Sequence, residues 1–117
     1  MPISDFKNYS DISVIEPTGE LGRREIAELC QTIDSLLQSD WVRIVLNLSQ
    51  VTHLHYAAIG HLVNSLLHLR LADGDLKLAH LDPYNKKIFQ FAGIHNYFET
   101  YDSLAEAVLS FERPLEG

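Results

Sequence analysis

The fold of this chain follows from the stretch VRIVLNLSQVTHLHYAAIGHLVNSL, residues 42–66. Residues 42–48 form an apolar, β-branched run, which is typical of a strand buried on both faces of a sheet. Apolar residues then take helical spacing from about residue 57 to residue 72, where ADGD predicts a turn. A buried strand that leads into a helix favours an α/β fold, in which strand-to-helix junctions often form the functional site.

The alternation of strands and helices continues on both sides of this stretch. Residues 11–19 predict a strand closed by a Pro/Gly turn, and residues 76–81 predict another strand. A helix is predicted over 23–39 from the spacing of its apolar residues, which are Ile26, Leu29, Cys30, Ile33, Leu36 and Leu37.

The C-terminal third carries the clearest helix boundaries. Asp82 is a good N-cap and Pro83 suits the first helical position, while Gly93 favours the end of that helix. One face of this predicted helix carries Tyr84, Ile88, Phe91 and Ala92. After a short strand candidate at 97–101, Ser103 and Glu106 form a capping box for a last helix.

These elements predict one domain, residues 1–117, of the α/β class. We expect a mixed, mostly parallel sheet of about four to five strands with about four α-helices packed on it.

Composition narrows the function classes. The chain has 117 residues, 46% apolar content and a formal net charge of −7. The basic residues are scattered, with Arg23–Arg24 and Lys86–Lys87 as the only pairs, so we expect no nucleic-acid binding and favour protein partners. The N-terminus lacks signal-peptide features, and no apolar run reaches the ~18 residues of a membrane span. With a single cysteine, Cys30, the sequence predicts a cytoplasmic protein without direct membrane insertion.

Six histidines raise the question of a metal site. His53 and His55 would share a face of a strand, and His61 and His68 a face of a helix. Zinc sites need three or four converging ligands, usually with a thiolate or carboxylate, yet no carboxylate lies between Leu48 and Ala72. We therefore predict solvated or hydrogen-bonded histidines and no metal.

Catalytic and cofactor motifs give little support for an enzyme. Ser49, Thr52 and Ser65 lie near histidines in the sequence, but G-x-S-x-G is absent. Gly19 and Gly22 lack the spacing of a phosphate-binding loop. The sequence predicts no cofactor and no enzymatic activity, although a small histidine-dependent enzyme stays an alternative.

Four motifs in order are similar to those of the STAS domain family, which includes bacterial anti-sigma factor antagonists and cytoplasmic domains of sulfate transporters. The first is VIEPTGELG, residues 14–22, like the family's strand followed by G-E-L-D. The second is the opening stretch, like the family's strand, D-L-S and D-S-S-G-L-G pattern. The others are GDLKLAHLDPYNKKIFQFAGIHNYF, residues 74–98, and TYDSLAEAVLSF, residues 100–111. The resemblance covers roughly residues 11–112.

The resemblance implies a switch that this chain has lost. In the family, D-S-S-G carries the serine that a partner kinase, itself an anti-sigma factor, phosphorylates. The unphosphorylated domain binds this partner, and the phosphorylated domain releases it. Here His55 and Tyr56 stand at the Asp and first Ser, and Ala57 stands at the phosphorylated Ser. Ala58 replaces the Gly, while Ile59 and Gly60 match the final L-G.

The resemblance therefore implies a regulatory protein-binding module without serine control. Its partner would be an anti-sigma factor, a serine kinase or another STAS protein, and a homodimer stays open. The alternative is a STAS subunit or scaffold of a transport system or of a multi-STAS signalling complex. The predicted partner-binding residues are His53, His55, Tyr56, Ala57, Ala58, Ile59, Gly60, His61, Gly19 and Gly22.

Overall fold

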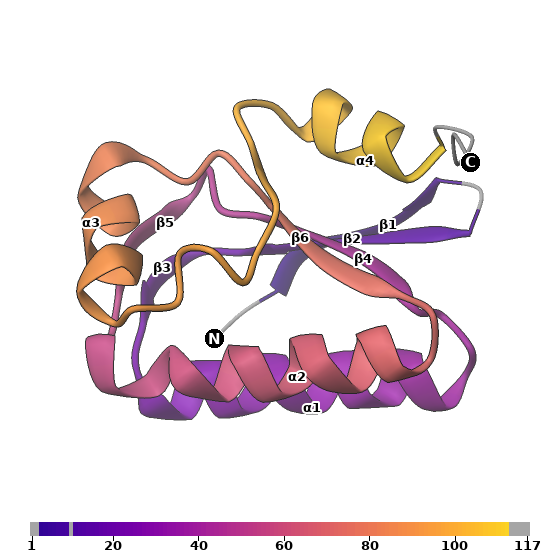
Figure 1. Ribbon diagram of the computed structural model, residues 1–117, viewed down its shortest axis with the longest axis horizontal. Helices are drawn as coiled ribbons and strands as arrows, with labels where there is room; N and C mark the ends of the chain where they lie inside the picture. The colour runs from indigo at the N-terminus through magenta and orange to yellow at the C-terminus, as the bar shows by residue number, and fades with distance from the viewer. Residues whose placement is uncertain (1–2, 10, 113–117) are drawn as a thin grey trace.

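The computed structural model describes residues 3–9 and 11–112, with side chains described for 11–112. The chain forms a five-stranded sheet in the order β1-β2-β4-β6-β7 (Figure 1). These strands are β1 Ile3–Tyr9, β2 Ile12–Pro17, β4 Arg43–Asn47, β6 Asp75–Ala79 and β7 Thr100–Tyr101. Strand β1 runs antiparallel to β2, and the other neighbours are parallel. The predicted mixed, mostly parallel α/β fold is confirmed.

Helices cover both faces of this sheet. Helices α1 (Arg23–Gln38) and α2 (Gly60–Leu71) lie side by side on one face, and α4 (Leu104–Glu112) lies on the other (Figure 1). Strand β4 shows why both covers are needed: Ile44 and Leu46 belong to the α1/α2 core, whereas Val45 belongs to the smaller α4 core. Side chains of a strand alternate between faces, so an apolar run without polar gaps requires two apolar layers.

Three strands were not predicted. Strand β1 adds an antiparallel edge strand beside β2. Strands β3 (Gly19–Leu21) and β5 (Val51–Leu54) form a separate two-stranded parallel sheet. Strands β3 and β5 are too short to show a strand pattern in the sequence. Their pairing with each other stabilises them.

The predicted face of helix α3 (Pro83–Phe91) is wrong in part. Its ends are as expected: Asp82 Oδ1 accepts from Asn85 N at 2.7 Å, and Gly93 follows the helix with φ of +72°. However, the buried residues of α3 are Asn85 and Phe89, while Tyr84 and Phe91 are exposed. Ile88 and Ala92 pack partly against the core. On the buried side, Phe89 packs into the main core and Asn85 satisfies a backbone group of β5, as described below.

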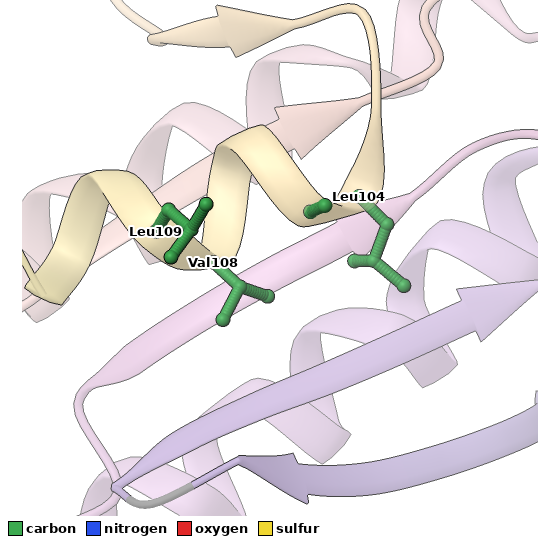
Figure 2. Close-up of a pocket in the computed structure, with 4 residues that line it drawn as sticks. Leu104, Val108 and Leu109 are labelled. Carbon is green, nitrogen blue, oxygen red and sulfur yellow. The ribbon is translucent and has the colours of Figure 1, made fainter.

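Helix α4 covers the second face of the sheet through a small apolar core. Leu104 and Val108 pack against the small core and point toward the neighbouring strands, whereas Leu109 is exposed (Figure 2). Together with Ala105 they line an open apolar hollow of about 380 Å³. At the start of α4, Glu106 N donates to Ser103 Oγ at 3.1 Å, which is one half of the predicted capping box.

Candidate functional site

The junction at residues 51–62 lies at one end of the molecule, between the starts of α1 and α2 and beside α3 (Figure 1). Parallel pairing of β3 with β5 places Glu20 opposite His53 and Leu21 opposite Leu54. His55 N then donates to Leu21 O at 2.9 Å. The pairing brings Gly22, which follows Leu21, close to His55 and places Gly19 opposite Val51, although each pair is more than thirty positions apart in sequence. Two of the sequence motifs therefore meet at this junction.

Helix α2 begins later than expected. A single 3₁₀ turn, Tyr56–Ala58, precedes it and is closed by Ala58 N donating to His55 O at 3.0 Å. The helix itself starts at Gly60. Ala57 thus lies in the turn before the helix rather than in its first turn, but still near its free N–H groups and their partial positive charge.

The predicted partner-binding residues divide into exposed and buried ones. His55, Tyr56, Ala57, Gly60 and His61 are exposed, and His53, Gly19 and Gly22 are half-buried. Ala58 and Ile59 are wrongly assigned as contact residues, because both are 0% exposed. They belong to the core beneath the turn, where the tight 3₁₀ path turns their side chains inward. We call the eight remaining residues the junction surface.

Gly22 and Glu25 fix the start of α1 beside the junction surface. Glu25 Oε1 accepts from Gly22 N at 3.1 Å, so the carboxylate satisfies a free N–H at the helix start. A Cβ atom at residue 22 would lie 2.9 Å from Glu25 Oε1, so glycine leaves room for this contact. Hydrogen bonds lower the pKa of the Glu25 carboxyl. The N–H of Glu25 itself has the largest effect, followed by the Arg24 side chain and Gly22 N.

The histidines do not gather into a metal centre. Tyr84 OH and His53 Nδ1 are hydrogen-bonded at 2.8 Å, and their rings lie 5.6 Å apart. His53 is therefore held against α3, whereas His55 and His61 face solvent. Across residues 3–9 and 11–112, no three His, Cys, Asp or Glu side chains are placed to hold a metal ion. In the same part of the chain, no helix is both long and apolar enough to cross a bilayer.

A buried asparagine that the sequence does not predict supports the junction surface. Asn85, on α3, is buried, and its Oδ1 accepts from Leu54 N at 3.0 Å. Because His55 N donates to Leu21 O, the N–H of the alternate residue Leu54 points away from β3, and it needs a partner from outside the small sheet. Asn85 and Tyr84 thus join α3 to β5 at two successive residues. The sequence offered no sign of this, because a polar residue in the first turn of a helix is usually exposed.

The side-chain amide of Asn47 holds the end of β4 through two hydrogen bonds. Asn47, which stands where the family pattern has an Asp, is buried. Its Nδ2 donates to Glu16 Oε2 at 2.8 Å, and its Oδ1 accepts from Ser49 N at 3.2 Å. An amide can both donate and accept, so it fixes the turn between β4 and β5 without adding a charge.

Comparisons with known proteins agree on the fold. A candidate anti-sigma factor antagonist from Thermotoga maritima is 21% identical, covers 93% of this chain and 94% of its own, and gives a TM-score of 0.85. The anti-sigma factor antagonist SpoIIAA, in its unphosphorylated form, is 18% identical over 96% of this chain and 98% of its own, with a TM-score of 0.80. A sulfate transporter family protein from Wolinella succinogenes is 12% identical over 90% and 91%, with a TM-score of 0.70.

These identities show a shared fold and no more. The family model for the STAS domain, in contrast, matches residues 4–107 directly. It begins earlier than the motifs quoted from the sequence because it includes the edge strand β1. A match over most of the sequence, together with the five-stranded sheet and its four helices, establishes that the chain belongs to the STAS domain family.

Proposed function

We propose that this chain is a regulatory protein-binding module of the anti-sigma factor antagonist type, which docks through the junction surface and is not an enzyme. Its partner is an anti-sigma factor, a serine kinase or another STAS protein. The observation that carries the proposal is Ala57, which is exposed in the turn before α2 at the position of the family's phosphorylated serine. A small apolar residue between Tyr56 and the histidines suits the centre of a protein contact.

The absence of a hydroxyl at position 57 makes this module constitutive. A phosphate near the start of α2 would be compatible with the helix dipole but would add about two negative charges to the contact surface. With alanine there, that charge cannot be added, and the domain stays in its binding-competent form.

The first prediction is that the chain gains no regulatory phosphate. Incubated with ATP and the anti-sigma factor kinase that binds it, the parent should keep its intact mass. Ala57→Ser, which restores the hydroxyl on an exposed turn, is the matched variant and should accept one phosphate. A stoichiometric phosphate on the parent, mapped to Ser49, Thr52, Tyr56 or Ser65, would contradict a constitutive module.

The second prediction concerns Ala57→Asp. A carboxylate before α2 suits the helix dipole, so the free energy of unfolding should change by less than about 1 kcal/mol. Affinity for the partner should fall about tenfold or more, which corresponds to about 1.4 kcal/mol, because a charge is desolvated at the contact. Isothermal titration calorimetry would measure the affinity.

The matched control for this prediction is Ala105→Asp. Ala105 is exposed in the first turn of α4, on the opposite face of the five-stranded sheet, and the substitution adds the same charge at a helix start. It should leave affinity unchanged. Equal affinity of the parent and Ala57→Asp, with both folded, would place the docking site elsewhere.

A STAS subunit or scaffold of a transport system is the second candidate. The fold shared with a sulfate transporter family protein supports it. Affinity purification from the native host, with cross-linked partners identified by mass, separates the two candidates. A kinase or anti-sigma factor cross-linked at residues 55–61 supports the regulatory module, and a transporter subunit there supports the alternative.

A further inference from the structure

Strand β1 gives the five-stranded sheet one long edge. It is the first strand in the order β1-β2-β4-β6-β7 and, within residues 3–9 and 11–112, it pairs only with β2 (Figure 1). The strand at the other edge, β7, has two residues, whereas β1 has seven and contains no proline. The backbone N–H and C=O groups along an edge of this length can pair with a further strand. The β1 edge is therefore a candidate interface.

The sequence of β1 is complementary to itself in one antiparallel register. Residues that lie opposite each other in an antiparallel pair share one face of the sheet. A twofold axis perpendicular to the sheet keeps every residue on its own face, so the axis must pass between one residue and its own copy. The candidates at the middle of Ile3–Tyr9 are Asp5, Phe6 and Lys7. The charges of Asp5 and Lys7 decide among them.

These charges favour the axis at Phe6. With Phe6 opposite its own copy, Asp5 of each chain lies opposite Lys7 of the other, and all seven residues of β1 are paired. An axis at Asp5 would place two carboxylates together, with Glu16 beyond each of them, because Glu16 on β2 lies opposite Asp5. An axis at Lys7 would place two ammonium groups together. Opposite charges across two strands stabilise their pairing and like charges destabilise it, so only the axis at Phe6 is electrostatically favourable.

We propose that two copies of this chain associate through β1, antiparallel and centred on Phe6, so that their sheets become continuous. The inference goes beyond the proposed function, because the junction surface is carried by β3, β5 and the turn before α2. The register of β1 with β2 is irregular between Ile3 and Asp5, and both Asp5–Lys7 pairs fall within the regular part. The contact is one strand wide and each copy carries −7, so we expect a weak dimer, with a dissociation constant between the micromolar and millimolar ranges.

The first test is Asp5→Lys, with dimerisation of the purified chain measured by analytical ultracentrifugation from micromolar to millimolar concentration. Dimerisation should weaken about tenfold or more, because both pairs of opposite charge become pairs of like charge. The variant lowers the net charge from −7 to −5, so general repulsion between copies would predict the reverse, a tighter dimer. The matched control is Asp34→Lys, which makes the same change at an exposed position of α1 and should dimerise at least as tightly as the parent.

The register itself is tested with a second variant, Lys7→Asp. Alone it should also weaken dimerisation about tenfold or more, because it places carboxylates opposite each other. An equal mixture of Asp5→Lys and Lys7→Asp should nevertheless form a mixed dimer, since each copy then supplies the charge that the other lacks. The double variant Asp5→Lys/Lys7→Asp exchanges the two charges, keeps the net charge at −7, and should dimerise within about threefold of the parent.

Three results would overturn the proposal. The first is a parent chain that stays monomeric up to millimolar concentration, even if a strand of another protein is found to pair with β1. The second is a dimer that Asp5→Lys and Lys7→Asp both leave intact, which would place the contact on another surface. The third is a loss of dimerisation in both single variants that neither their mixture nor the double variant restores. The substitutions would then have damaged β1, and the register centred on Phe6 would be wrong.

Discussion

Replacement of Phe89 by alanine should lower the free energy of unfolding by about 3–5 kcal/mol, the cost expected for truncating a buried aromatic residue. Phe89 is 1% exposed and fixes α3 to the main core. Its ring meets that of Phe98 edge-on, with centroids 5.6 Å apart at 75°, an arrangement that adds to the stabilisation by burial. Because a domain of this size is stable by about 5–15 kcal/mol, Phe89→Ala should move the urea midpoint strongly or leave the chain unfolded.

The control for this prediction lies on the same helix. Phe91→Ala makes the same chemical change two residues further along, at a side chain that is 82% exposed. It should alter stability by less than about 0.5 kcal/mol. Similar losses for the two variants would mean that α3 is rotated toward the orientation that its apolar pattern suggested, with Phe91 inside.

The second large effect is expected for Asn85→Ala, which should lower the free energy of unfolding by about 2 kcal/mol. Asn85 is 2% exposed, and its removal leaves the N–H of Leu54 buried without its acceptor. An unsatisfied buried donor costs about 1–3 kcal/mol, and the gain in helix propensity from alanine offsets only part of this. Urea unfolding measures the loss of stability. In hydrogen exchange, the Leu54 amide should exchange faster than in the parent, by more than the loss of global stability explains.

Asn64→Ala serves as the comparison for the second effect. Asn64 is an exposed helical asparagine on α2, so its replacement should change stability by less than about 0.5 kcal/mol. A loss for Asn85→Ala no larger than that for Asn64→Ala, with the Leu54 amide still protected, would show that the strand does not depend on this side chain. The proposed surface would then lose its support, since Asn85 holds β5 where it passes beneath α3.

The position of the candidate site stays a prediction, and the structure changes part of its composition. The stretch from His53 to His61 indicated a surface at a strand-to-helix junction, and the exposure of His55, Tyr56 and Ala57 is compatible with it. The same stretch could not show that Ala58 and Ile59 turn inward, because a three-residue turn before a helix has no apolar periodicity of its own. Tyr84 and Asn85 lie 31 residues from their partners His53 and Leu54, beyond the reach of any local pattern.

By itself, the sequence determined the features that depend on neighbours along the chain. The buried run at 42–48, the N-cap at Asp82 and the stop at Gly93 predict strand β4 and both ends of α3, because backbone propensity and capping act within a few residues. The lack of a hydroxyl at position 57 is likewise fixed by the sequence. Only the tertiary structure decided the pairing of β3 with β5 and the rotation of α3, which buries Asn85 and leaves Phe91 exposed. The physical reason is that both contacts of the buried side join residues distant in sequence: Phe89 packs into the main core, and Asn85 accepts from a buried N–H on β5.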